Sequence, residues 1–175
     1  MIFLDTEFTN FVSPALLSFS MVSLDKHEIY AELDLVLDPI GQERSRVASK
    51  FTRDVVISQF GRMPASKCSA QELGERAGEW LIARARDARG RITIAYDYDG
   101  DFGLLRDALT AAGFWDRVQP VLLVENVYRG VSSAEGKRAA GASWLESSLY
   151  RGLERHHALA DALALRAAWE AVCGR

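Results

Sequence analysis

The spacing of apolar residues changes along this chain, and the change restricts the folds that the chain can adopt. Residues 2–4 form an apolar run that is too short for a helix and suits a buried strand. Apolar and polar residues alternate in 17–21 and again in 31–37, as they do in strands with one buried face. The first 38 residues therefore predict three strands that are mostly antiparallel.

Helical spacing replaces this alternation in the middle of the chain. Ser69 and Glu72 have the spacing of a capping box, which predicts a helix that ends near Gly90. Residues 130–142 are rich in Gly, Ser and Ala, and we expect them to form a mobile loop. The other expected elements are a strand at 91–98, a helix at 102–112, a short strand at 121–124 and a closing helix at about 158–172.

The order of these elements predicts an α/β fold. Three antiparallel strands, followed by parallel strands that alternate with helices, would form a mixed sheet in a three-layer α/β/α arrangement. The length of 175 residues fits a single domain over residues 1–175, and a hydrophobic fraction of 49% is enough for one sizeable core.

Charge and composition exclude several kinds of protein. The formal net charge is −3, so phosphate binding would need local basic groups or metal ions rather than a general positive field. No apolar run approaches the roughly 20 residues that span a bilayer, so no membrane association is expected. The first residues carry neither a basic nor a long apolar segment, and Cys68 and Cys173 make no disulfide framework. We therefore expect a cytoplasmic protein with free thiols.

Asp5 and Glu7 stand at the end of the first predicted strand. Residues two apart in a strand point to the same face, so both carboxylates would project side by side. Two anions there repel each other unless a cation compensates them, and such hard oxygen ligands suit Mg²⁺ or Mn²⁺. The alternative is that the strand simply ends at Asp5 and that both acids are solvated.

Asp101 follows the strand at 91–98 and begins the helical pattern at 102–112. An acid at a helix N-terminus is stabilised by the helix dipole, and the alternative to a metal ligand at this position is an N-cap. Asp97 and Asp99 lie nearby, and Asp99 is the reserve candidate for the third carboxylate.

His156 and Asp161 lie around the start of the last helix. Five residues of regular helix turn through roughly 500°, so the two converge only if His156 precedes the helix and Asp161 lies in its first turns. Histidine titrates near neutral pH, which suits a general base. An exposed polar turn is the alternative for the pair His156-His157. All three segments are junctions between strands and helices, where α/β folds gather functional groups.

These junctions resemble the motifs of the DEDD superfamily of 3′–5′ exonucleases, in its branch with a catalytic histidine (DEDDh). Residues 3–7 match the first motif, Asp-x-Glu after an apolar strand. Residues 100–105 match the second, an Asp that opens a helix with a Leu shortly after it. Residues 156–162 match the third, His-x-Ala-x-x-Asp-Ala, at every fixed position. The resemblance spans nearly the whole chain and is strongest to small single-domain members such as oligoribonuclease and ribonuclease T.

The resemblance implies a ribonuclease-H-like fold and hydrolysis assisted by two divalent cations, Mg²⁺ or Mn²⁺. Asp5 would bridge the two ions, with Glu7, Asp101 and Asp161 as further ligands, and His156 would be the general base. The products would be a nucleoside 5′-monophosphate and a strand shortened by one at its 3′ end. Single-stranded RNA is favoured over DNA as the substrate.

Two departures from the family pattern indicate a divergent subfamily. Thr9-Asn10 stands where many members have Thr-Gly after the first motif. The second motif usually has a His-Asn-x-x-Phe-Asp character, whereas residues 96–101 read Tyr-Asp-Tyr-Asp-Gly-Asp. The second departure leaves the identity of the third carboxylate open.

Candidate substrate-binding residues lie beside the motifs and in the predicted loop. Phe8 and Thr9 follow the first motif and could contact the terminal nucleotide, although Phe8 could equally be a core residue. Arg129, Lys137 and Arg138 could bind backbone phosphates or form a solvated basic loop. A cluster of arginines is most simply an exposed helix face and its end; its members are Arg84, Arg86, Arg89 and Arg91.

Two other functions stay open at the level of sequence. Residues 5–9 also resemble the start of a haloacid-dehalogenase-type phosphatase with Asp5 as nucleophile, although that family has a second Asp where Glu7 stands. A nuclease-like domain that only binds RNA or a protein partner is the non-catalytic alternative. A homodimer is plausible by analogy, with Trp115 or Trp144 as contact candidates.

Overall fold

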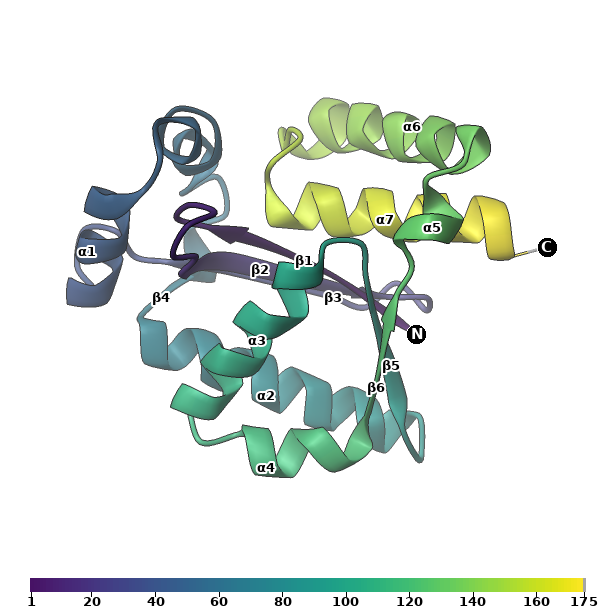
Figure 1. Cartoon of the computed structure of the whole chain (residues 1–175), viewed down its shortest axis with the longest axis horizontal. Coiled ribbons are helices and arrows are strands. Elements are labelled where there is room, and N and C mark those ends of the chain that lie inside the picture. The colour runs from purple at the N-terminus through teal and green to yellow at the C-terminus, as the bar shows by residue number, and fades with distance from the viewer. Residues whose placement is uncertain (175) are drawn as a thin grey trace.

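The strand β1 (Ile2–Phe8) lies inside a mixed six-stranded sheet in the computed structural model, which describes residues 1–174 (Figure 1). The strand order is β4-β3-β2-β1-β5-β6. The first three strands pair antiparallel, as their alternation predicts, and the pairs β3–β4, β1–β5 and β5–β6 are parallel. The other strands are β2 (Leu16–Ser23), β3 (Glu28–Leu33), β4 (Lys67–Cys68), β5 (Ile92–Tyr96) and β6 (Leu122–Asn126).

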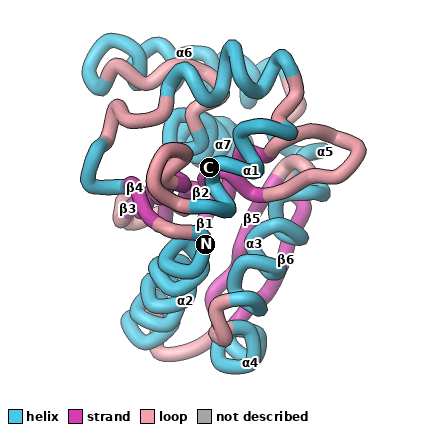
Figure 2. The backbone as a smooth tube through the Cα atoms, turned by 90° about the vertical axis from the view of Figure 1, so that its left-hand side faces the viewer, coloured by secondary structure: helices cyan, strands magenta, loops and turns pink. Residues whose placement is uncertain are grey.

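Helices cover both faces of the sheet. The longer ones are α1 (Pro39–Val47), α2 (Ala70–Asp87), α3 (Asp99–Ala111), α6 (Ala134–Arg151) and α7 (Ala158–Cys173), and the short ones are α4 (Trp115–Val118) and α5 (Tyr128–Val131). A π-helical turn at Thr52–Val56 and 3-10 turns at Ile57–Gln59, Pro64–Ser66 and Gln119–Val121 complete the set. Both views place α6 and α7 on one side of the sheet and α2, α3 and α4 on the other (Figures 1 and 2). The predicted α/β fold with a mixed sheet is confirmed.

Adjacent residues of β1 pack into different cores on the two faces of the sheet. Leu4 belongs to the larger core, which includes residues of α2 and α3 such as Leu81 and Leu105. Phe3 belongs to a smaller core with Leu165 of α7, on the other face. This alternation is the ordinary side-chain geometry of a strand, and it prevents β1 from slipping by one residue.

The predicted helix beginning at Ser69 is confirmed. The Ser69 hydroxyl accepts the backbone N–H of Glu72, and the Glu72 carboxylate accepts the backbone N–H of Ser69. The third strand ends at Leu33 rather than continuing to residue 37, because the Asp34 carboxylate accepts the backbone N–H groups of Val36 and Leu37 and closes a turn.

The expectation of a mobile loop at 130–142 is wrong, because α6 begins at Ala134. The Ser133 hydroxyl caps this helix by accepting the backbone N–H of Gly136. Gly136 also packs against the Val131 carbonyl, where a Cβ atom would lie 2.2 Å from the oxygen. The small residues that predicted a loop are therefore part of α6, and the absence of a side chain at Gly136 allows this helix to lie close to the backbone of α5.

The two tryptophans proposed as dimer contacts are not exposed. Trp115 is partly buried and its ring packs edge-on against Phe102, with centroids 6.2 Å apart. Trp144 is also partly buried and donates its Nε1–H to Asp161. Both side chains are engaged inside the chain, so neither supports the expected homodimer contact. Among the helices of residues 1–174, none is both long enough and apolar enough to cross a bilayer.

Gly74 of α2 lies where the helix crosses α3, and its replacement tests this packing. A Cβ atom there would lie 2.3 Å from the Ala108 carbonyl oxygen. We expect Gly74→Val to lower the free energy of unfolding by about 1–3 kcal/mol, because backbone must move. Gly141→Ala in the exposed middle of α6 is the control and should raise that free energy by about 0.5–1 kcal/mol. Urea unfolding curves measure both, and an unchanged Gly74→Val would refute the packing.

Candidate active site

The parallel pairing of β1 with β5 places acidic residues from both strands together. The pairing joins Ile2 to Ile94 and Phe3 to Ala95, an offset of 92 residues. If the same pairing continues for two more residues beyond Phe3 and Ala95, Asp97 lies beside Asp5. The carboxyl ends of neighbouring parallel strands are the usual place for functional groups in α/β sheets.

Asp5, Asp97 and Asp101 form one group of acids at this position. One carboxylate oxygen of each lies within 4.8 Å of the others. The sequence pattern assigned no role to Asp97, so it is a fifth acid that the motifs missed. The signal that could have found it is its position directly after the strand that pairs with β1.

Asp101 lies in the first turn of α3 and is 2% exposed. It is not the N-cap, which is Tyr98. The Thr6 hydroxyl donates to one of its carboxylate oxygens at 2.6 Å. Asp99 is exposed and accepts the Asn126 side-chain amide at 2.5 Å, outside the acidic group. The structure therefore places Asp101, and not the reserve candidate Asp99, with the other acids.

Glu7, His156 and Asp161 form a second group, again with one donor atom of each within 4.8 Å of the others. Asp161 lies in the first turn of α7, and His156 lies in the turn before that helix, as their convergence requires. The Asp161 carboxylate accepts the His156 backbone N–H at 3.0 Å and the Trp144 indole N–H at 2.6 Å. These two bonds fix the carboxylate on both sides.

The two adjacent histidines have different environments. His156 is partly buried, its backbone is in the left-handed region with φ 67°, and its ring packs edge-on against Phe51. His157 is 2% exposed, precedes α7, and accepts the Leu159 backbone N–H on Nδ1. The exposed-turn interpretation is therefore wrong for His157, which is part of the helix cap. A left-handed conformation in a residue with a side chain is uncommon and recurs at functional sites.

Burial and mutual repulsion shift the acids away from their usual ionisation. Burial, followed by the charges of Asp161 and the other acids, raises the pKa of Asp5 well above its ordinary value, and the pKa of Glu7 rises for the same reasons. Burial raises the pKa of Asp101 to about 7, against the opposing hydrogen bond from Thr6. Burial raises the pKa of Asp161 to about 6, although the hydrogen bonds from Trp144 and His156 oppose it.

Two buried carboxylate oxygens in this cluster lack a hydrogen-bond partner among residues 1–174. They are Oδ2 of Asp5 and Oδ2 of Asp101. An unpaired buried carboxylate oxygen is unfavourable unless something compensates it. Carboxylate oxygens in such number are the donors that Mg²⁺ and Mn²⁺ take, and an imidazole at the edge is compatible with either ion. The residues present therefore fit divalent cations.

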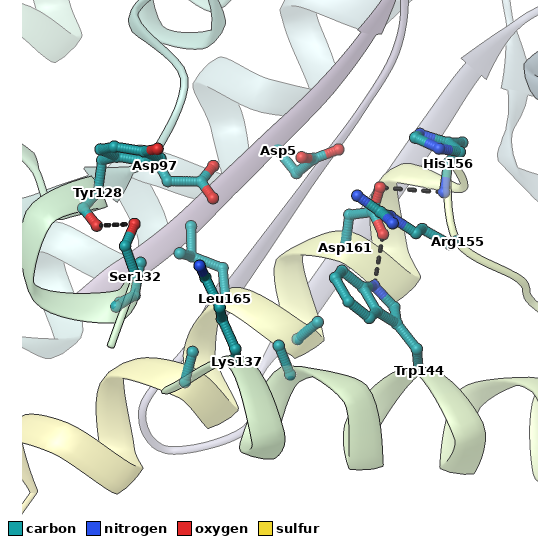
Figure 3. A pocket seen from close by; sticks show the side chains of 14 residues that line it. Asp5, Asp97, Tyr128, Ser132, Lys137, Trp144, Arg155, His156, Asp161 and Leu165 are labelled. Carbon is teal, nitrogen blue, oxygen red and sulfur yellow. Dashed lines mark hydrogen bonds between the residues drawn. The ribbon is translucent and has the colours of Figure 1, made fainter. Parts of the chain in front are cut away.

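Two cavities, of about 460 and 410 Å³, open on either side of the acids. Both are lined by the same five residues, Asp5, Asp97, Arg155, His156 and Asp161. The first extends between α5, α6 and α7, where Lys137 points into it from α6 (Figure 3). The second is lined by aromatic side chains, which are Phe8, Phe11, Phe51 and Tyr98.

The structure brings two of the five predicted substrate-binding residues to these cavities. Phe8 lines the second cavity and its ring is stacked on Tyr98 at 5.7 Å, and Lys137 lines the first. Thr9 is fully buried, with a hydroxyl that donates to the Ser13 carbonyl and accepts the Ala15 N–H, so it holds the loop after β1 instead. Arg129 and Arg138 are exposed on α5 and α6, outside the lining of either cavity.

Arg155 is a further residue of the site that the motifs did not identify. Its guanidinium carbon lies 4.8 Å from the centre of the Trp144 ring, and the side chain lines both cavities. Trp144 therefore contacts a cation through its face and the Asp161 carboxylate through its N–H. Position next to His156 was the only sequence signal for Arg155, and the sequence analysis assigned its partner Trp144 to a candidate dimer contact instead of the site.

No protein-family model matches this chain, and no curated protein matches it either. The chemistry of these two cavities and their shared wall is therefore the basis for assigning a function.

The raised carboxyl pKa values predict how stability depends on pH. When the pKa of Asp101 is about 7 in the folded chain and near 3.8 unfolded, the protonated form favours folding. That stabilisation is complete below about pH 4 and is lost as the pH rises towards 7. We expect Asp101 alone to lower the unfolding free energy of the metal-free chain by up to about 1.4 kcal/mol per pH unit over this window. The pKa of His157, which burial lowers to about 4, opposes this change, but the raised pKa values of Asp5, Glu7 and Asp161 add to it, so the expected net change is a loss. Thermal unfolding in chelator between pH 4 and 8 measures it.

Added Mn²⁺ should reverse this loss near neutral pH. At one hundred times its dissociation constant, a bound ion adds about 2.7 kcal/mol, and less at pH 5 because protons compete for the carboxylates. Asp5→Asn should be more stable than the native chain without metal and should lose the response to Mn²⁺. Glu79→Gln, an exposed acid on α2, is the control and should behave like the native chain. A native chain that Mn²⁺ leaves unchanged at pH 7 would contradict the assignment.

Proposed function

We propose that this chain is a metal-dependent 3′–5′ exonuclease of the DEDDh type, with a ribonuclease-H-like fold. The observation that carries the proposal is the convergence of acids from β1, α3, α7 and the end of β5 with His156, beside the wall that two cavities share. The resemblance in the motifs at 3–7, 100–105 and 156–162 names the same residues, with Asp97 as an addition.

Five carboxylates would hold two divalent cations, Mg²⁺ or Mn²⁺. They are Asp5, Glu7, Asp97, Asp101 and Asp161. Such ions lower the pKa of water and stabilise the charge that develops on the attacking and leaving oxygens of a phosphodiester. The chain's own contribution is to fix the donors before substrate arrives, through Thr6 on Asp101 and through Trp144 on Asp161.

His156 would be the general base that takes the proton of the attacking water. Burial and then the charge of Arg155 lower the pKa of His156, so the imidazole is neutral and can accept a proton at pH 7. Contact with the Phe51 ring restricts the imidazole, and the bond from the His156 backbone to Asp161 ties its backbone to the acids. The reaction would release a nucleoside 5′-monophosphate.

The two cavities suit the two sides of a scissile phosphate. The aromatic cavity, with Phe8 stacked on Tyr98, offers ring faces for a base. The other cavity carries Lys137 and Arg155, which would bind the phosphates of the strand. Bases must be unstacked to reach an aromatic cavity, which favours single strands, and the small single-domain members of the family favour RNA as the substrate.

Hydrolysis of 5′-labelled RNA and DNA oligomers tests the proposed function. We expect a ladder that shortens by one nucleotide from the 3′ end in Mg²⁺ or Mn²⁺, with nucleoside 5′-monophosphate as the product. Asp101→Asn should lower kcat by roughly 10³-fold or more, because one charged donor is lost. Asp99→Asn is the matched control, since Asp99 is exposed and bonded to Asn126. His156→Ala should lower kcat by about 10²–10⁴-fold and keep Mn²⁺ binding.

Two outcomes would overturn this assignment. Unchanged hydrolysis by Asp101→Asn would mean that the acidic cluster is not the centre of the reaction. Full Mn²⁺ binding with no release of nucleotide from any oligomer would indicate a domain that binds nucleic acid without cleaving it.

Arg155 should contribute to substrate binding rather than to the chemical step. Arg155→Gln keeps much of the side-chain length and removes the charge that lies over Trp144. We expect KM to rise several-fold with kcat little changed. The salt dependence of binding to single-stranded RNA should fall by about 0.7 in logarithmic slope, the value for one phosphate contact. Arg138→Gln is the control, because Arg138 is exposed on α6 and lines neither cavity. This variant should leave KM and the salt dependence of RNA binding unchanged.

A further inference from the structure

Four arginines surround a cleft of about 450 Å³ that is separate from the two cavities of the acidic site. This arginine cleft is formed by Arg86, Arg89, Arg91 and Arg117 over an apolar floor of Ile82, Ala85 and Val121. Its residues come from the end of α2, the turn between α2 and β5, α4 and the 3-10 turn before β6. The arginine cluster of the sequence is thus divided, because Arg84 turns away and Arg117 joins from another segment.

The guanidinium groups of the arginine cleft have no carboxylate partner within residues 1–174. Arg84 shows the contrast on the same helix, since it pairs with Asp87 at 2.6 Å and lies against the Trp80 ring. The whole chain carries a net charge of −3, so a general excess of basic residues does not explain the grouping. All four side chains are exposed, so water screens part of their mutual repulsion, and an anion between them would relieve the rest.

Arg89 occupies a backbone position that normally belongs to glycine. Its φ is 52°, and it is the first residue beyond the cap of α2, where the Arg89 N–H bonds to the Arg86 carbonyl and the Gly90 N–H to the Ala85 carbonyl. This is the Schellman arrangement, whose left-handed residue is usually Gly. Gly90 stands one position later, so the chain keeps an arginine at a strained position and directs its side chain to the cleft.

Arg117 is brought to the end of α2 by close helix packing. A Cβ atom on Gly78 would lie 2.3 Å from the Phe114 ring, so only glycine allows this ring to contact α2. The Arg117 guanidinium carbon lies 5.0 Å from the centre of the same ring. Packing against an aromatic face restricts the side chain, so the charge is held at the cleft before any ligand arrives.

We propose that the arginine cleft binds nucleotide units of a nucleic-acid strand. Planar guanidinium groups bind phosphate oxygens in pairs and stack on bases, and the apolar floor would cover a base or a sugar. An acidic peptide would match the charges and leave the floor of Ile82, Ala85 and Val121 without an apolar partner. The four positive charges together with the apolar floor therefore favour nucleotides over an acidic peptide.

The arginine cleft and the acidic site lie at opposite ends of β5, because Arg91 precedes this strand and Asp97 follows it. Asp97 lies six positions after Arg91, and six steps of extended strand span about 20 Å. If the proposed exonuclease function holds, on which this step rests, the arginine cleft would hold the strand several nucleotides away from the 3′ end being cleaved. Long substrates would then bind more tightly than short ones.

Arg89→Gly separates loss of the ligand from loss of the fold. Glycine suits the left-handed position, so the melting temperature should rise by about 1–3 °C. Fluorescence anisotropy in chelator, with the full chain, would measure binding of a 5′-labelled single-stranded RNA 20-mer and of a trinucleotide. We expect the variant to bind the 20-mer about 3–10-fold more weakly, with a salt slope lower by about 0.7, and the trinucleotide unchanged.

Two further variants test whether the effect belongs to the arginine cleft. Arg86→Gln with Arg117→Gln should weaken 20-mer binding in the same way, whereas Arg84→Gln, which removes one charge from the same helix, should not. Hydrolysis of the trinucleotide in Mn²⁺ should be the same for Arg89→Gly and the native chain. Absence of hydrolysis in the native chain would count against the exonuclease function alone, because the anisotropy does not depend on it.

Three results would overturn the proposal. The first is native affinity and salt slope for the 20-mer in Arg89→Gly and in the double variant. The second is competition by a polyglutamate peptide that equals competition by RNA of the same charge, which would indicate an acidic peptide. The third is binding of 5′-AMP that equals binding of the 20-mer and is lost in Arg89→Gly, which would indicate a site for free nucleotides.

Discussion

Repulsion among buried and partly buried carboxyl groups is the constraint on which the candidate site depends. Asp5, Asp97 and Asp101 meet from three segments, and two of their oxygens have no hydrogen-bond partner among residues 1–174. Such a cluster works against folding, so the rest of the chain must hold it in place. Phe3 and Leu4 do so by anchoring β1 in separate cores on the two faces of the sheet. The proposed function would therefore oppose stability at this end of β1, as is common in active sites.

Part of this arrangement could be predicted from the sequence and part could not. Short-range patterns predicted the β1 strand, the capping box at Ser69 and the turn that joins His156 to Asp161. They could not identify Asp97, because its place depends on the register of two strands that are 92 residues apart. They placed Thr9 at the substrate because it follows the first motif, although Thr9 lies beyond the end of β1 and is buried, with its hydroxyl bonded to the backbone of Ser13 and Ala15.

The largest error of interpretation concerned residues 130–142, and it changes the picture of the site. Small residues there suggested a mobile segment, whereas Gly136 and its neighbours allow α6 to pack against α5 and α7. The wall of the first cavity is consequently a helix in which Trp144 holds both the Asp161 carboxylate and the Arg155 cation. The composition of residues 130–142 predicted a mobile loop, whereas packing against α5 and α7 stabilises a helix there. Packing also overrides local preference at Arg89, whose backbone is in the left-handed region that arginine disfavours.

The cap that joins His156 to α7 also limits how this chain can vary in length. Asp161 accepts the His156 backbone N–H across five positions, and the orientation of its carboxylate is set by its place in the first helical turn. One inserted residue between them would rotate the carboxylate by about 100° around the α7 axis and direct it away from Glu7. Homologous chains that keep the chemistry should therefore conserve the spacing itself, even where the intervening side chains differ.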